Sequence, residues 1–233
     1  TETDTMLLLE NRKDGISHYL EEELAKFPLP PCKDAGAIVM NANPFTRGHR
    51  YLIETAAQAC DVLHVFVLSA DASEFPADVR LRLVREGCRD LENVMVHGSS
   101  EYLISHATFP DYFLKDKAGA SDKAAELDLK IFADYFRDAF HIKKRFVGEE
   151  PFSPVTRAYN EQMKQTLPAC GIEVVEIPRK TCGDTIISAT LVREKFLAGH
   201  MESLRPLVPD NTYRYLVSQE GIALRKQLLE RQS

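Results

Sequence analysis

The sequence lacks closely spaced cysteines. Its five cysteines are odd in number, widely separated and never arranged as C-x-x-C: Cys32, Cys60, Cys88, Cys170 and Cys182. This pattern argues against a disulfide framework or a zinc knuckle. A chain of 233 residues can bury roughly three quarters of its unfolded surface and needs no such cross-links. We therefore expect a reducing, cytoplasmic compartment.

A long apolar run and an excess of basic charge are also missing. No stretch of about 18 apolar residues is present, and residues 1–34 carry eight acidic against four basic side chains, where a secretory signal needs a basic start. The whole chain has a net charge of −6. Such a field repels polyanions, although a local basic pocket for a small phosphate compound is compatible with it. We expect neither a membrane nor a nucleic acid as the main partner.

The glycine-rich loops of most nucleotide-binding α/β proteins are absent as well. Neither G-x-x-x-x-G-K-[ST] nor G-x-G-x-x-G occurs, which leaves a kinase-type P-loop and a standard dinucleotide-binding fold unsupported. A phosphate site in this chain must be built from other residues.

What is present is a regular alternation of short apolar runs and helical patterns. After a predicted leading helix over 17–27 and a proline-rich linker, the run 35–40 is typical of a strand buried on both faces, and helical spacing begins after Thr46. The pattern then predicts strands over 62–69, 94–97, 144–148 and 171–177 and helices over 76–88, 123–140 and 154–167. Such alternation predicts an α/β fold, a Rossmann-like parallel sheet with helices on both faces.

The tail after Asp184 is predicted to be helical throughout, with breaks at 199–200, 206–209 and 221. We accordingly expect a leading helix and linker (1–34), a sheet domain (35–200) and a helical C-terminal extension packed on it (201–233).

The loop after the first predicted strand, Asn41-Ala-Asn-Pro-Phe-Thr-Arg-Gly-His49, ends at a predicted helix N-terminus. Free N–H groups and a partial positive charge at that terminus attract phosphate, Gly48 lets a phosphate approach the backbone, and His49 can donate to a phosphoryl oxygen. A lone Gly-His pair is more often an ordinary loop, so the loop becomes a candidate only together with a second site.

A second phosphate-binding pattern, Ile187-Ser-Ala-Thr-Leu-Val-Arg193, lies near the end of the last predicted sheet unit. It places hydroxyls at a helix N-cap and first turn and an arginine one turn further. Alone, Ser188 is a helix cap and Arg193 a surface charge. Paired with the first loop, they give two helix N-termini that could hold opposite ends of one triphosphate.

Together the two patterns resemble the HxGH/ISSTxxR nucleotidyltransferase superfamily, whose members attack the α-phosphate of a nucleoside triphosphate and release pyrophosphate. Within it, the sequence is similar to the [citrate (pro-3S)-lyase] ligase family over roughly residues 6–220. The similarity is carried by 38–51, 107–110, 147–160 and 187–193.

The resemblance implies roles for particular residues. His49 would stabilise charge on the α-phosphate, Thr46 stands where most of the superfamily has its first histidine, and Arg193 would bind the outer phosphates. Other ATP-binding positions implied by the resemblance are Asn41, Asn43, Pro44, Gly48, Gly148, Glu149, Ser188 and Thr190. No residue is implied as a metal ligand.

The resemblance also implies an AMP-forming acid–thiol ligase that uses ATP, with Mg²⁺ held mainly by the triphosphate. Acetate would be the acid, and the acyl carrier subunit of citrate lyase would accept the acetyl group. The family usually carries an acetyltransferase-like N-terminal domain, which this sequence does not contain. Two alternatives are a nucleotidyltransferase that forms a dinucleotide or CDP-alcohol, and a non-catalytic nucleotide-binding module.

Further chemically interesting residues have structural interpretations. A binding and a structural role are equally compatible with Arg157, Tyr159 and Asn160, whereas an apolar helical stripe is typical of core: Phe132, Tyr135, Phe136 and Phe140. The scattered histidines are isolated and none is a predicted metal ligand: His64, His97, His106 and His141. Cys182 is expected to be a small buried apolar residue rather than a nucleophile.

Overall fold

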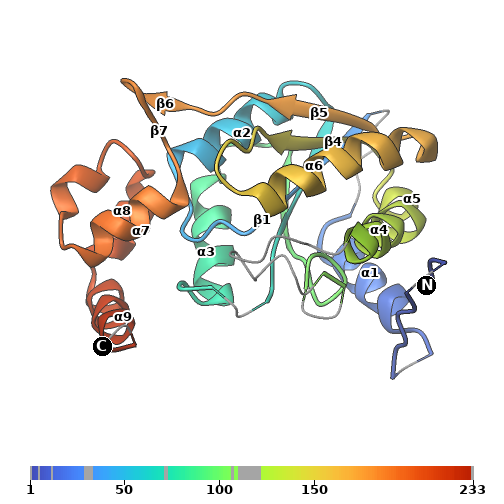
Figure 1. Cartoon of the computed structure of the whole chain (residues 1–233), viewed down its shortest axis with the longest axis horizontal. Coiled ribbons are helices and arrows are strands. Elements are labelled where there is room, and N and C mark those ends of the chain that lie inside the picture. Colours follow the sequence, from blue (N-terminus) through green and yellow to red (C-terminus); the bar gives the residue numbers. More distant parts are fainter. Residues whose placement is uncertain are drawn as a thin grey trace.

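A five-stranded sheet forms the centre of the computed structural model (Figure 1), which describes residues 2–4, 6–11, 13–28, 34–70, 73–105, 108–109 and 122–231. The strands are β1 (Ala35–Met40), β2 (Val62–Val67), β3 (Val94–Gly98), β4 (Ile142–Gly148) and β5 (Glu173–Ile177). They are ordered β3-β2-β1-β4-β5, and every adjacent pair is parallel. β1 and β2 are buried almost throughout, as expected of strands covered on both faces.

Helices cover both faces, which confirms the predicted fold class. One apolar cluster joins the sheet to α2 (Arg47–Ala57), α3 (Ala77–Gly87) and the C-terminal helices. The other joins it to α1 (Gly15–Lys26), α4 (Asp122–Ile131) and α6 (Pro154–Thr166), which is followed by η3 (Leu167–Cys170). After α4 the chain continues through a π-helical turn, η2 (Phe132–Phe136), into α5 (Arg137–Ala139). Phe132, Phe136 and Phe140 are buried there, so the predicted core stripe is confirmed for them, while Tyr135 is half-buried.

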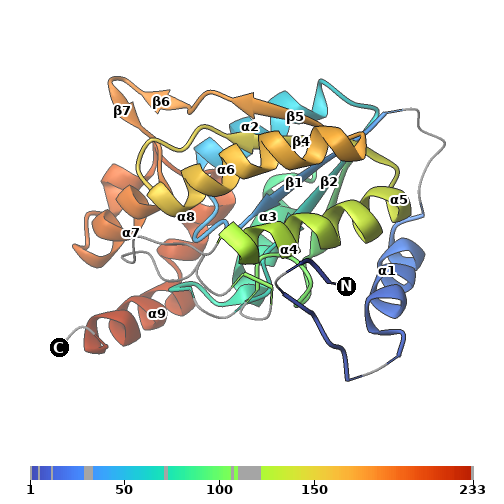
Figure 2. The same ribbon diagram turned by 45° about the vertical axis from the view of Figure 1, so that its right-hand side comes forward.

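The C-terminal region is α7 (Ala189–Leu197), η4 (Met201–Leu204), α8 (Asp210–Leu216) and α9 (Gln219–Glu230). Figures 1 and 2 show α7, α8 and α9, in orange to red, beyond the carboxyl ends of β4 and β5, with α1 on the opposite side of the molecule. Buried side chains of α7, α8 and α9 belong to the same cluster as those of α2 and α3. The C-terminal helices are therefore part of the core that supports the carboxyl edge of the sheet.

The tail departs from the prediction in three ways. It is not helical from residue 184, because β6 (Thr181–Cys182) and β7 (Thr185–Ile186) form an antiparallel hairpin that turns at Gly183, whose φ is 58°. Cys182 is exposed on this hairpin, not buried. Gly221 does not break a helix either: it lies in the first turn of α9, where a side chain would collide with the carbonyl oxygen of Tyr215.

No helix among the described residues is long and apolar enough to cross a membrane.

Candidate functional site

The site lies at the point where the sheet order reverses. β1 is paired with β2 on one side and with β4 on the other, so the segments that follow β1 and β4 leave the carboxyl edge next to each other. Open parallel sheets bind ligands at such a switch point. The loop 41–46 follows β1 and residues 149–153 follow β4, which brings both to this position.

Thr46 and His49 form a capping box at the start of α2. Thr46 Oγ1 accepts a hydrogen bond from the His49 backbone N–H at 3.2 Å, and His49 Nδ1 accepts one from the Thr46 N–H at 3.1 Å. Because Nδ1 accepts, the proton of the neutral imidazole is on Nε2. Thr46, only 1% exposed, therefore fixes both the orientation and the tautomer of the His49 ring.

His49 is neutral at physiological pH. Burial, and then the positive charges of Arg179 and Arg193, lower its pKa to about 3. The ring stacks against Phe45 with the centroids 6.1 Å apart. A neutral ring with its proton on Nε2 can donate a hydrogen bond to a phosphoryl oxygen without first taking up a proton.

Arg193 joins the second motif to the first. Ser188 caps α7 by accepting a hydrogen bond from the Leu191 N–H at 3.1 Å. One turn later Arg193 donates to the Asn43 carbonyl oxygen at 2.6 Å and to Thr190 Oγ1 at 3.2 Å. Two motifs 150 residues apart in the chain thus meet in space.

Gly48 allows the starts of α2 and α7 to approach closely. A Cβ at this position would lie 3.0 Å from the carbonyl oxygen of Ile187, which is tighter than ordinary packing. The sequence predicts that Gly48 admits a phosphate; in the structure it admits the backbone that leads into α7.

Asn41 and the buried Arg80 hold the first loop. The Asn41 amide exchanges hydrogen bonds with Ser73 Oγ at 3.0 and 3.1 Å. Arg80, on α3, donates to Asn41 Oδ1 at 2.8 Å and to four backbone carbonyl oxygens, those of Asn41, Leu68, Ala70 and Phe75. Arg80 has no exposed surface, yet nothing in its local sequence pattern distinguishes it from a solvated helix charge, so its role is visible only in the fold.

Asn43 and Glu74 form the link between this loop and Arg193. Asn43, 4% exposed, donates to Glu74 and accepts a hydrogen bond from the Phe75 N–H at 3.0 Å. Glu74 also pairs with Arg193 Nε at 3.1 Å. Pro44 is buried, after a cis peptide bond. In the structure these side chains contact other parts of the protein and shape the loop, and their contact with ATP stays a prediction.

A second arginine lies on the other side of the site. Arg179 follows β5, donates to the Glu149 carbonyl oxygen and pairs with Glu150 at 2.6 Å. Glu149 is exposed, and its N–H donates to the Ile177 carbonyl oxygen at 3.0 Å. Its partners Glu149 and Glu150 follow β4, the strand beside β1, and its charge lowers the pKa of His49, so Arg179 belongs to the site. Sequence analysis missed it, since one arginine after a strand carries no motif.

Arg157, Tyr159 and Asn160, for which the sequence is compatible with a binding or a structural role, make contacts within the protein. Arg157 donates to the carbonyl oxygens of Glu150 and Pro151, and Asn160 donates to that of Gly148 at 3.2 Å. Tyr159 donates to Asp128 Oδ2 at 2.7 Å. The structural interpretation is therefore supported for all three.

His64 and His97 are not isolated, contrary to the prediction. His64 Nδ1 and His97 Nε2 are 3.1 Å apart on adjacent strands, and His97 Nδ1 is 3.0 Å from Glu23 Oε2 on α1. All three side chains are buried. His106 lies outside the described residues, and His141 is exposed.

Within the described part of the chain, no cluster of three or more His, Cys, Asp or Glu side chains is arranged to hold a metal ion. The two partly buried carboxylates of the site are engaged, Glu74 by Arg193 and Glu150 by Arg179. In the described part of the site, both of these carboxylates are thus occupied by arginines.

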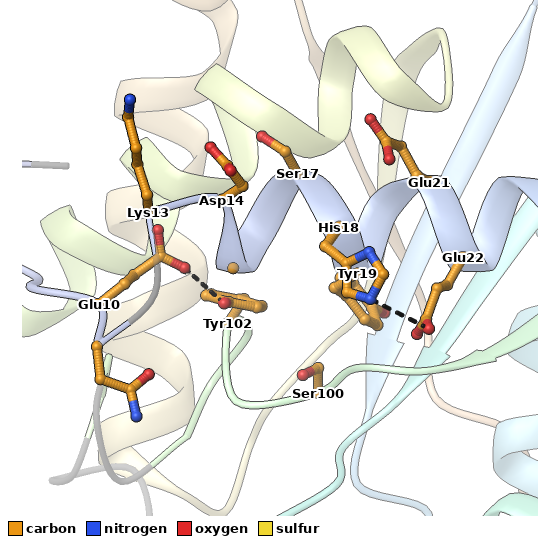
Figure 3. Close-up of a pocket in the computed structure, with 12 residues that line it drawn as sticks. Glu10, Lys13, Asp14, Ser17, His18, Tyr19, Glu21, Glu22, Ser100 and Tyr102 are labelled. Atoms are coloured by element: carbon orange, nitrogen blue, oxygen red, sulfur yellow. Dashed lines mark hydrogen bonds and ion pairs between the residues drawn. The ribbon is translucent and has the colours of Figure 1, made fainter.

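A pocket of about 700 Å³ lies elsewhere, where the start of α1 meets the loop after β3 (Figure 3). Its lining includes Glu10, Asp14, Glu21 and Glu22. Figure 3 shows a hydrogen bond between Tyr102 and Glu10. The Tyr102 hydroxyl donates to Glu10 Oε1, and the two oxygens are 2.5 Å apart. An acidic lining disfavours phosphate, so the loops around His49 and Arg193 remain the candidate site.

The sequence matches a known family model and is similar to proteins of that family. A family model described as the citrate lyase ligase C-terminal domain matches residues 35–216. The [citrate [pro-3S]-lyase] ligase of Escherichia coli K12 is 45% identical over 216 residues, which cover 91% of this chain and 61% of that protein. The Haemophilus influenzae protein of the same name is 47% identical over 186 residues, 78% of this chain and 56% of that protein. The chain thus spans about three fifths of the length of these relatives.

Solved structures show the same fold. A NadR protein in complex with NR matches with a TM-score of 0.51 and 19% identity, covering 79% of this chain and 46% of that chain. A bifunctional NMN adenylyltransferase/ADP ribose pyrophosphatase from Francisella tularensis matches with a TM-score of 0.51 and 12% identity, covering 84% and 54%.

Proposed function

Because the chain belongs to the citrate lyase ligase family, we propose that it activates acetate with ATP and acetylates the prosthetic-group thiol of the citrate lyase acyl carrier subunit. An acetate oxygen attacks the α-phosphorus of ATP, which gives acetyl-adenylate and releases pyrophosphate. The thiol then attacks the acetyl carbonyl, which gives the thioester and AMP. The supply of ATP favours the cytoplasm, the compartment that the cysteine pattern predicts.

The hydrogen bond from Arg193 to the Asn43 carbonyl oxygen carries this proposal. It holds the start of α7 against the loop that precedes α2, so that two helix N-termini and one guanidinium face the same end of the sheet. The Nε of Arg193 pairs with Glu74. One N–H of Nη1 donates to the Asn43 carbonyl oxygen, and one N–H of Nη2 donates to Thr190 Oγ1. Among the described residues no other group bonds this guanidinium, so two of its five N–H groups remain for the β- and γ-phosphates.

His49 lies between these elements and acts at the α-phosphate. Its Nε2 proton, fixed by the Thr46 capping box, donates to an oxygen whose negative charge grows as the acid attacks. A donor held in place in this way stabilises the transition state more than the bound substrate. The protein contributes mainly position and charge neutralisation, as is general for phosphoryl transfer.

Mg²⁺, when bound with ATP, would neutralise phosphate charge. Since Glu74 and Glu150 are paired with arginines, we propose that the ion is held by the triphosphate oxygens and by water, as Mg²⁺ commonly is at nucleotide sites.

The test is ATP–pyrophosphate exchange with a series of small carboxylic acids. Exchange that requires acetate supports the ligase. Exchange or product formation with a nucleotide or an alcohol phosphate in place of the acid would indicate a nucleotidyltransferase that makes a dinucleotide or CDP-alcohol. Binding of ATP in calorimetry without turnover with any acceptor would indicate a non-catalytic module.

A further inference from the structure

We propose that Arg179 binds the carboxylate of the acid substrate, on the side of His49 away from the triphosphate. The proposal rests on the function proposed above, because it names the residue that holds the second reactant of the same site. Arg179 belongs to neither phosphate motif.

The two arginines of the site are anchored after different strands: Arg193 after β1 and β2, and Arg179 after β4. Arg193 is held by Asn43, after β1, and by Glu74, in the segment after β2. Arg179 follows β5 and is held by Glu149 and Glu150, after β4. In the strand order β3-β2-β1-β4-β5, Glu74 and the pair Glu149 and Glu150 follow the strands on either side of β1, whose loop leads into the helix that carries His49. Both guanidiniums are near enough to lower the pKa of His49.

Arg179 keeps donors for a ligand. Its Nε and one N–H of Nη2 are used by Glu149 and Glu150. Within the described residues no group bonds Nη1, so three of the five N–H groups are available. The remaining Nη1 and Nη2 protons form a fork that matches the two oxygens of a carboxylate. The side chain is 26% exposed, so the fork is accessible while its stem is held.

The chemistry of the reaction requires a cation at this position. In-line displacement places the attacking oxygen and the leaving pyrophosphate on opposite sides of the α-phosphorus. The attacking group is itself an anion that approaches another anion, so it must be neutralised and oriented. With Arg193 at the leaving side, the arginine at the other side of His49 is placed for the attacking acid.

The experiment compares R179A with the wild-type chain in acetate-dependent ATP–pyrophosphate exchange and in calorimetric titration with ATP. Loss of a charge-assisted bidentate contact should raise the KM for acetate about 10- to 100-fold. The Kd for ATP should stay within about twofold of the wild-type value, since the proposed contacts to the nucleotide do not involve Arg179. R179K should recover only part of the loss, because a point charge cannot replace the fork.

A matched control is R157A. Arg157 holds the same loop through the carbonyl oxygens of Glu150 and Pro151, but it does not act on His49. If Arg179 merely stiffens the loop, R157A should raise the KM for acetate equally, and that result would overturn the proposal. A rise in the Kd for ATP without a rise in the KM for acetate would also overturn it.

A readout independent of activity is the pKa of His49, followed by NMR. Removing the Arg179 charge should raise this pKa, whereas R157A should leave it unchanged. If wild-type enzyme shows no acid-dependent exchange, the ligase function fails, and the carboxylate role of Arg179 fails with it. If exchange is normal in the wild type and in R179A, only the role of Arg179 fails.

Discussion

At the scale of single residues, Thr46 and His49 act as one unit, because the first sets the tautomer of the second. We expect H49A to lower the turnover of acetate-dependent exchange about 10²- to 10³-fold, the usual effect of losing a donor positioned for the transition state. Affinity for ATP should change little, and circular dichroism should show an intact fold. Turnover within about threefold of wild type would contradict the role of His49.

The depressed pKa of His49 predicts the pH dependence of catalysis. Its pKa of about 3 lies below the ordinary value of 6.5, so the neutral donor is present throughout the physiological range. The kcat/KM for ATP should therefore show no loss centred near the ordinary histidine pKa between about pH 5 and 8. A loss of activity near that pH that disappears in H49A would show that the free enzyme holds His49 in a different environment.

Arg193 should affect binding rather than the chemical step. We expect R193A to weaken ATP and pyrophosphate binding about tenfold or more, because charge-assisted hydrogen bonds to phosphate are lost. AMP, which lacks the outer phosphates, should bind nearly as before. Calorimetry with the three ligands measures this difference, and equal losses for ATP and AMP would place Arg193 elsewhere.

At the scale of elements, a buried chain of side chains ties α1 to the sheet. Glu23 on α1 accepts from His97 on β3, and His97 faces His64 on β2. No group of the described residues forms a hydrogen bond with His64 Nε2. Burial, and then the charges of His97 and His141, lower the pKa of His64 to about 3.

This depressed pKa predicts acid sensitivity. Below pH 6.5 the unfolded chain binds a proton at His64 that the folded chain excludes, so stability falls as the pH falls from there toward about 3. The loss is about 1.4 kcal/mol per pH unit from this group. In H64Q, which keeps an amide donor but does not titrate, urea unfolding at pH 7 and pH 5 should differ by about 2 kcal/mol less than in wild type. Equal pH dependence of the two proteins would show that His64 is protonated when folded.

Local sequence patterns correctly predicted those helices and strands in which apolar residues recur at one regular spacing. The run 35–40 is β1 as predicted, because burial on both faces leaves a continuous apolar run in the sequence. The helix after Thr46 begins at Arg47, because the Thr46 cap is a signal within a few residues. The β6–β7 hairpin was missed because its strands have two residues each, too short for a period. The exposure of Cys182 follows from that hairpin.

At the scale of the whole molecule, the sequence predicted the two helix starts of the site but not what holds them together. Ser188 and Thr46 are read from local capping patterns. Glu74, Arg80 and Arg179 act through contacts with distant segments, such as the 39 positions between Arg80 and Asn41. A single sequence contains no signal for such contacts, so the roles of Glu74, Arg80 and Arg179 emerged only from the fold.

The arrangement of the whole chain also predicts which half of the reaction it performs. Both phosphate motifs, Arg179 and all five strands of the sheet lie between residues 35 and 200, while the relatives are longer than this chain. Since every residue described for the candidate site lies within that range, we expect this chain alone to catalyse acetate-dependent ATP–pyrophosphate exchange and to give acetyl hydroxamate when hydroxylamine traps the adenylate.

Transfer of the acetyl group should require added carrier protein. Among the free cysteines of the described chain, burial raises the pKa of Cys60 to about 11 and that of Cys88 to about 12. Burial keeps these thiols protonated and poorly nucleophilic. Mass spectrometry after incubation with ATP and labelled acetate should find the label on added carrier and none on the chain itself. If the label is found on the chain in the absence of carrier, the acetyl group passes through an acetyl-enzyme and is not transferred directly. If hydroxamate forms but added carrier is never labelled, the surface that accepts the carrier is missing from this chain.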